Sequence, residues 1–327
     1  MFTDSSIFLR DYFFPKITLK NSNELKSVYD HLNNVNLSQV NIKSTKKYKN
    51  KKLSIESGAD IIKNKSYLFN QEVIILAIDK INITINLNYH KDNDKLKENI
   101  IQTVQFMSSL SEIPIKYLEI DIYPVNVNKT ITKNTNQLSQ NHINSGYCKY
   151  GQITKIVIYR EEELLKVLIH ELIHAFKFDN YDDTPNIINH YHKKYNINSD
   201  KINTNEAYTE IWANIINCYL ISQKVGRNKY NLFLILISLE KEFSTFQAEK
   251  VMYLTKLNEK DTIDINKETN VLSYFIIRNE IYKRINVFLK YCKIYNEDYI
   301  KIKDKNNFFN FLKKNETIQK KNKRFNN

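Results

Sequence analysis

The residues best suited to chemistry lie in one short stretch, which runs from His170 to His174 and reads His-Glu-Leu-Ile-His. Two histidines four residues apart stand on one face of an α-helix, so both imidazole rings can reach the same metal ion. Glu171 lies beside them and can act as a base toward a water molecule on that metal. The opposite face of the predicted helix is apolar, through Leu165, Leu168, Leu172 and Phe176. The pattern therefore predicts a metal site on a helix that packs into the core, and histidines that only hydrogen-bond within the core are the alternative.

A catalytic zinc site needs a third protein ligand besides two histidines, and it keeps one position open for water. Glu206 and Glu210 stand four residues apart in a second predicted helix. One of these carboxylates can bind the metal while the other orients a ligating histidine through a hydrogen bond. A solvent-facing pair of acidic residues is the alternative interpretation, and His190 or His192 is the alternative third ligand.

The two motifs together resemble those of the thermolysin-like gluzincin peptidases, which carry His-Glu-x-x-His and, on a later helix, Asn-Glu-x-x-Ser-Asp. In this chain the second motif is 205–210, which reads Asn-Glu-Ala-Tyr-Thr-Glu, with Thr replacing Ser and Glu replacing Asp. The resemblance covers residues 144–216 and implies a zinc ion held by His170, His174 and Glu206. It also implies a hydrogen bond from His170 to Glu210, a role in which the family has the shorter Asp. The His-Glu-Leu-Ile-His string is also similar to that of clostridial neurotoxin light chains, another gluzincin group.

The resemblance implies hydrolysis of peptide bonds in a peptide or protein substrate, with Zn²⁺ as the cofactor and Glu171 as the catalytic base. Gluzincins also use a Tyr or His side chain to stabilise the oxyanion that forms when water attacks the carbonyl. The candidates for this donor are those closest in sequence to the metal helix, namely Tyr181, His190, Tyr191 and His192.

Apolar patterning predicts an α+β fold, to which the resemblance adds a zincin-like arrangement. Alternating or continuous apolar runs predict strands over 72–78, 81–87, 115–123 and 152–159, with a turn at Asp79 and Lys80. Helical spacing predicts helices over 95–110, 205–222, 230–253 and 271–295. We therefore expect an N-terminal mixed sheet whose helices include the metal helix, which ends near Asp179 and Asn180, and a mostly helical C-terminal subdomain.

Four segments are expected along the chain: an N-terminal extension (1–66), a zincin N-terminal subdomain with the metal helix (67–180), a helical subdomain with the third-ligand helix (181–305) and a basic tail (306–327). The extension is expected to contain a strand over 13–19, a helix over 22–32 and a polar loop or linker over 33–52. A polar surface loop is expected over 125–142.

A strand at the sheet edge, just before the metal helix, binds extended substrate by strand addition in the family that this chain resembles. Residues 145–148 and 153–158 are the two stretches that could form such a strand. An ordinary internal hairpin is the alternative interpretation.

Composition and charge indicate which kinds of partner the protein could bind. The 327 residues are 42% hydrophobic and 12% aromatic, as in a globular protein, and carry a net charge of +13. Lysine clusters at 46–52 and 320–324 favour anionic partners such as nucleic acid, but the AT-rich codons of Lys, Asn and Ile explain them equally well. The alternatives to a peptidase are therefore a basic nucleic-acid-binding protein with an incidental motif and a catalytically silent zincin-fold interaction protein.

Cysteine usage and the N-terminus indicate location. The three cysteines, Cys148, Cys218 and Cys292, are widely spaced and predict neither a disulfide framework nor a cysteine zinc site. Residues 1–20 show no secretion signal, and no apolar run is long enough to cross a membrane. These features predict an intracellular protein, and the basic tail is a candidate nuclear-targeting segment.

Overall fold

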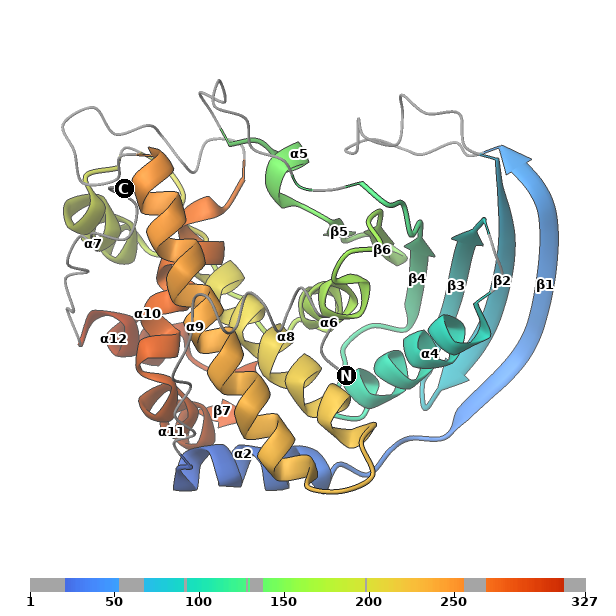
Figure 1. The fold of residues 1–327 in the computed structure, drawn as a ribbon, viewed down its shortest axis with the longest axis horizontal. Coiled ribbons are helices and arrows are strands. Elements are labelled where there is room, and N and C mark those ends of the chain that lie inside the picture. Colours follow the sequence, from blue (N-terminus) through green and yellow to red (C-terminus); the bar gives the residue numbers. More distant parts are fainter. Residues whose placement is uncertain are drawn as a thin grey trace.

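The computed structural model describes residues 21–52, 68–90, 93–127, 129, 138–197, 199–255 and 269–314. It has a mixed α+β fold in which a six-stranded sheet stands against a group of helices (Figure 1). The strands are β1 (Val40–Lys52), β2 (Leu68–Ile78), β3 (Ile81–Tyr89), β4 (Tyr117–Ile122), β5 (Gly146–Lys149) and β6 (Thr154–Ile158). The predicted α+β class and its mixed sheet are confirmed.

The strand order is β1-β2-β3-β4-β6-β5. The predicted hairpin of β2 and β3 is confirmed, because Ile78 pairs with Ile81 across a turn in which Asp79 has a φ of 49°. β3, β4 and β6 run parallel to one another, and β5 pairs antiparallel with β6. Alternate residues of β3 are buried from Ile81 to Leu87, which is the period of two that predicted the strand.

β1 corrects the prediction of a polar loop or linker over 33–52. The segment from Val40 to Lys52 pairs antiparallel with β2 and forms one edge of the sheet. All its described side chains are exposed or partly exposed, so the strand lacks the apolar alternation by which strands are recognised. Lysines along an edge strand also disfavour pairing with a further chain.

Two of the helices directly follow strands of the sheet. α4 (Asp94–Ser108) connects β3 to β4, and α6 (Leu164–Ala175) follows β6 and contacts β5, β6, α4 and α8 (Figure 1). The other helical elements are α2 (Asn23–Asn33), α5 (Gln140–Ile143), α7 (Pro185–Tyr195), α8 (Thr204–Gln223), α9 (Lys229–Thr255), η1 (Leu272–Ile277), α10 (Arg278–Lys283), α11 (Ile285–Tyr295) and α12 (Lys305–Lys313). A short hairpin of β7 (Asn296–Glu297) and β8 (Lys301–Ile302) lies between α11 and α12.

The single helix predicted over 271–295 is wrong. The chain there forms a π-helical segment, η1, and then the separate helices α10 and α11. The break falls at Arg284, whose φ of −120° and ψ of 31° lie outside the helical range. Apolar residues on both sides of the break are buried, so their spacing alone did not reveal it.

Some of the predicted segments lie partly or wholly outside the described residues. The strand predicted over 13–19 and the lysine cluster at 320–324 lie outside the described residues, as does much of the loop predicted over 125–142. The helix predicted over 22–32 is confirmed as α2, which buries Leu25, Val28 and Leu32 in the main core. The division into four segments stays a prediction. None of the described helices combines the length and the apolarity needed to cross a membrane.

Candidate metal centre

α6 carries both histidines of the motif and packs against β6 and β5, the last two strands in the sheet order. Leu168, Leu172 and Phe176 are fully buried on its core side. The helix ends at Ala175, earlier than the predicted end near Asp179 and Asn180. The chain then turns through Lys177, whose φ of 59° is left-handed, and this turn brings Asp179 back to the imidazole ring of His174.

Three potential ligand atoms converge between α6 and α8. Nε2 of His170 lies 3.1 Å from Nε2 of His174, and Oε2 of Glu206 lies 3.3 Å from each of these nitrogens. The ligand atoms of the three residues all lie within 4.8 Å of one another. His170, His174 and Glu206 therefore come together as the sequence predicted, although they lie on two different helices.

The other ring nitrogen of each histidine is held by a carboxylate. Nδ1 of His170 lies 2.9 Å from Oε2 of Glu210, and Nδ1 of His174 lies 2.7 Å from Oδ2 of Asp179. An ionised carboxylate only accepts hydrogen bonds, so each Nδ1 carries the proton. In the neutral rings both Nε2 atoms then present lone pairs to one another and to Glu206, an arrangement that a bound cation relieves.

The ligand types and their number fit zinc. Two imidazole nitrogens with one carboxylate oxygen form the His₂Glu set of catalytic zinc sites, and carboxylates that fix the Nδ1 protons are the usual support of such histidines. Imidazole ligands disfavour calcium and magnesium, which prefer all-oxygen sites. The residues present therefore fit the metal that the sequence predicted.

The cluster attracts positive charge. Burial by itself would lower the pKa of His170, but hydrogen bonds to Glu206 and Glu210 outweigh burial and raise that pKa to about 9. Burial is likewise outweighed at His174, where Asp179 and Glu206 raise the pKa. For Glu206 burial would raise the pKa, but the two histidines lower it. The carboxylate of Glu206 thus stays ionised, and the imidazoles bind protons strongly unless a metal competes for them.

Buried cations support Glu210. Its Oε1 accepts from Nζ of Lys166 at 2.5 Å and from a guanidinium nitrogen of Arg278 at 2.9 Å, while its Oε2 faces His170. Lys166, Arg278 and Glu210 have side-chain exposures of 13%, 7% and 8%, so these ion pairs are screened little by solvent. The longer Glu, where the resembled family has Asp, therefore still reaches the ligating histidine.

Neighbouring polar side chains fix the other carboxylates. Asp179 also accepts from Oγ1 of Thr209 at 2.9 Å, and Oε1 of Glu206 accepts from Nδ2 of Asn270 at 3.1 Å. Each carboxylate therefore has a defined orientation toward the histidines. Sequence reasoning missed Asp179, Thr209 and Asn270, because nothing in their local pattern distinguishes them from ordinary loop or helix residues.

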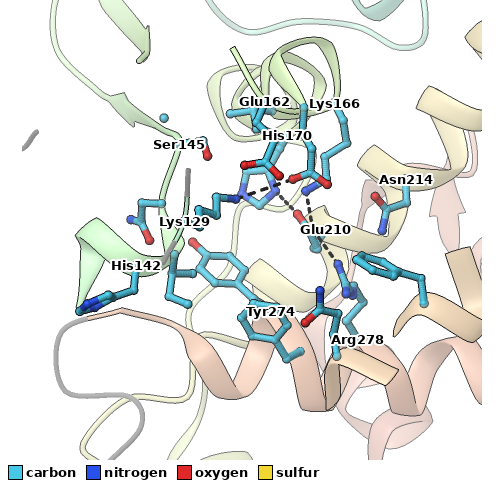
Figure 2. A pocket seen from close by; sticks show the side chains of 18 of the residues that line it. Lys129, His142, Ser145, Glu162, Lys166, His170, Glu210, Asn214, Tyr274 and Arg278 are labelled. Carbon is cyan, nitrogen blue, oxygen red and sulfur yellow. Dashed lines mark hydrogen bonds and ion pairs between the residues drawn. The ribbon is translucent and has the colours of Figure 1, made fainter. Parts of the chain in front are cut away.

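A pocket of about 440 Å³ adjoins the cluster, and His170, Glu171, Glu210 and Tyr274 line part of it (Figure 2). Glu171 is 6% exposed, and burial raises the pKa of its carboxyl group. β5 passes close above it, since a Cβ placed on Gly146 would lie 3.3 Å from Oε1 of Glu171 and only 2.9 Å from the carbonyl oxygen of Val157. Glycine at this position lets the edge strand lie against the metal helix.

Tyr274 is a further pocket residue that the sequence did not indicate. It lies in η1, and its ring centroid is 5.9 Å from that of His170. Burial raises the pKa of its hydroxyl, and the charges of Glu206 and Glu171 raise it further. The hydroxyl therefore keeps its proton at neutral pH and can donate a hydrogen bond into the pocket.

The four candidate oxyanion donors, which were chosen by proximity in sequence, lie away from the pocket. Tyr181 packs edge-on against Phe308 and Phe309, with its hydroxyl 3.2 Å from Oγ1 of Thr204. His190, Tyr191 and His192 belong to α7, where Tyr191 is fully buried and Nε2 of His192 contacts the carbonyl oxygen of Ser199. Among the residues described, none of the four lines the pocket beside Glu171, whereas Tyr274 does.

Comparisons with known proteins do not indicate a function for this chain. No protein-family model matches the chain, and no solved structure matches it. It is 25% identical over 149 residues to "Uncharacterized protein R210" of Acanthamoeba polyphaga mimivirus. The match covers 40% of this chain and 37% of that protein, so the chain spans little more than a third of the relative's length.

Proposed function

We propose that this protein is a zinc-dependent peptidase with a zincin-like catalytic core. The observation that carries the proposal is the convergence of Nε2 of His170, Nε2 of His174 and Oε2 of Glu206, with both Nδ1 atoms tied to carboxylates. Such an arrangement of ligands beside a buried glutamate in an open pocket supports metal-assisted hydrolysis. A mixed sheet whose antiparallel edge strand, β5, contacts the metal helix supports the zincin-like assignment.

Zinc held by His170, His174 and Glu206 would supply a Lewis acid that lowers the pKa of water and polarises a carbonyl group. Glu171 is the group that takes the proton from the attacking water and returns it to the leaving amine. Its buried carboxyl group, with a raised pKa, is suited to both tasks. Tyr274 donates a hydrogen bond to the carbonyl oxygen as negative charge develops there.

The edge strand β5 is the proposed binding site for the peptide backbone. It forms one end of the sheet order, whereas β6, the other stretch that the sequence offered, is an internal strand between β4 and β5. Gly146 lines the pocket together with Glu171. An extended peptide that adds to β5 would therefore pass over the metal helix, with main-chain hydrogen bonds supplying affinity.

A randomised peptide mixture incubated with the zinc-loaded protein tests this function, with cleavage sites read by mass spectrometry. We expect cleavage by the natural chain and none by Glu171→Gln, which should retain zinc and thermal stability, because the amide fills the same space but cannot accept the proton. Glu161→Gln makes the same change on an exposed residue before α6 that does not line the pocket, and this variant should cleave normally. Equal cleavage by the natural chain and Glu171→Gln, or none by the zinc-loaded natural chain, would contradict the proposal.

A further inference from the structure

The pocket extends from the metal-binding residues to a wall formed by α8 and α9. Along α9 the lining residues recur at every turn, at Glu240, Phe243, Gln247, Lys250 and Leu254. α8 contributes Glu210 and Asn214, and η1 contributes Tyr274 and Phe275 (Figure 2). A substrate side chain that enters beside Glu171 therefore meets this wall.

Most charges around this wall already have partners. Lys166 and Arg278 both bind Glu210, and Nζ of Lys129 lies 3.7 Å from a carboxylate oxygen of Glu163. Lys250 lies ten residues beyond Glu240 on the same helix, which separates their Cα atoms by about 15 Å. None of these four cations forms an ion pair with the pocket carboxylate that α9 contributes.

Glu240 is that carboxylate. Among the residues that the structure describes, no hydrogen bond and no ion pair within 4.0 Å reaches it. Burial raises the pKa of its carboxyl group, and the nearby carboxylates Glu163 and Glu210 add to the rise while Arg278 and Lys166 oppose it. The side chain is half-buried, so its charge is screened less than at the open surface, and a hydrogen-bond donor supplied by a ligand interacts with it more strongly there.

Asn214 places a second polar group in the same wall. It is 3% exposed, and its Nδ2 atom has no hydrogen-bond partner among the described residues. The amide is seen beside Glu210 in Figure 2. Burial raises the pKa of the Tyr282 hydroxyl and the Asn214 amide opposes that rise, which places the amide nitrogen toward Tyr282 and leaves the amide oxygen for a donor.

We propose that Glu240 and Asn214 form a specificity subsite for a lysine or arginine side chain of the substrate, an inference that rests on the proposed peptidase function. Phe243 and Phe275 supply apolar walls for the aliphatic stem, while the cationic head binds the carboxylate of Glu240 and the amide oxygen of Asn214. An acidic side chain would be repelled by Glu240, and an apolar one would leave both polar groups unpaired.

The first arm of the test uses the zinc-loaded natural chain with blocked decapeptides that are randomised except for one fixed residue: Lys, Arg, Gln, Glu or Leu. We expect kcat/KM for the Lys and Arg sets to exceed that for the Leu set by about 10- to 100-fold, as for a hydrogen-bonded charge. Glu240→Gln should remove most of this preference, and Glu240→Lys should shift it toward Glu. Glu242→Gln is the matched control, since it makes the same change on α9 away from the pocket lining.

The second arm separates this inference from the peptidase proposal. Fluorescein-labelled nonapeptides with a central Lys, Gln, Glu or Leu are titrated into zinc-loaded Glu171→Gln, with and without Glu240→Gln, and binding is read by anisotropy. Tighter binding of the Lys peptide that depends on Glu240 supports the subsite even if no peptide is cleaved, in which case the peptidase proposal alone fails. Cleavage or binding without a basic preference, a preference unchanged in Glu240→Gln, or the absence of binding overturns the subsite.

Discussion

Asp179 offers a sharp test of the metal centre because it does not bind the metal in this account. Its Oδ2 lies 2.7 Å from Nδ1 of His174, and its side chain is 3% exposed. Asp179→Asn keeps an oxygen that can accept this hydrogen bond but removes the negative charge that makes the imidazole a better ligand. Replacing such a supporting group lowers metal affinity by about 10- to 100-fold. We expect about tenfold for Asn and closer to 100-fold for Asp179→Ala, or about 1.4 and 2.7 kcal/mol of binding free energy.

Zinc affinity is measured by competition with a chromogenic chelator of known affinity at constant pH. Asp182→Asn serves as the control, because Asp182 is exposed nearby and the chemical change is the same. Far-ultraviolet circular dichroism and thermal melts in chelator establish that each variant folds. An affinity of folded Asp179→Asn within about twofold of the natural chain would refute the role assigned to this hydrogen bond.

Three further changes test other parts of the site. Glu206→Ala should lower zinc affinity more than Asp179→Ala does, because it removes a ligand rather than its support, and chelator competition giving an unchanged affinity would move the third ligand elsewhere. Tyr274→Phe should lower kcat by about 100- to 1,000-fold with little change in zinc content, as for loss of an oxyanion donor; steady-state kinetics with a similar kcat would exclude that role. In chelator, the free energy of unfolding should fall as pH rises from 6.5 to about 9, because the folded-state pKa of His170 is raised to about 9 and its stabilisation is complete only below the unfolded-state value. Urea unfolding at pH 6, 7.5 and 9 measures this, and a flat or rising profile would contradict it.

The parts of the site that the sequence predicted are those encoded within one helix. His170, Glu171 and His174 share a face of α6, and Glu206 and Glu210 share a face of α8, so residue spacing alone places each group correctly. That Glu206 joins the two histidines was implied by the resemblance, and in the structure its Oε2 lies 3.3 Å from Nε2 of each histidine.

The supporting residues could not be predicted in the same way. Asp179 reaches His174 only because α6 ends early and Lys177 adopts a left-handed conformation. Arg278 and Tyr274 come from a region that patterning assigned to one continuous helix, and they reach the site through tertiary packing. Local propensity carries no information on such long-range contacts, so proximity in sequence selected residues of α7 instead.

The strand β1 is likewise a feature that local sequence patterning does not reveal. A strand is recognised by one buried face, and β1 has none among its described side chains. Its pairing with β2 is satisfied by backbone hydrogen bonds, which leave no trace in the order of polar and apolar residues. The buried strands β3, β4 and β6 were predicted because apolar side chains fill their core-facing positions.

The zinc content of the purified protein tests the central claim most directly. Elemental mass spectrometry is applied to protein prepared without chelator or histidine tag, alongside the double variant His170→Ala/His174→Ala. The proposed site predicts about one zinc per chain in the natural protein and almost none in the variant. A natural chain that contains no zinc and takes up none on titration, or a double variant that retains it, would contradict the metal centre and the peptidase function built on it.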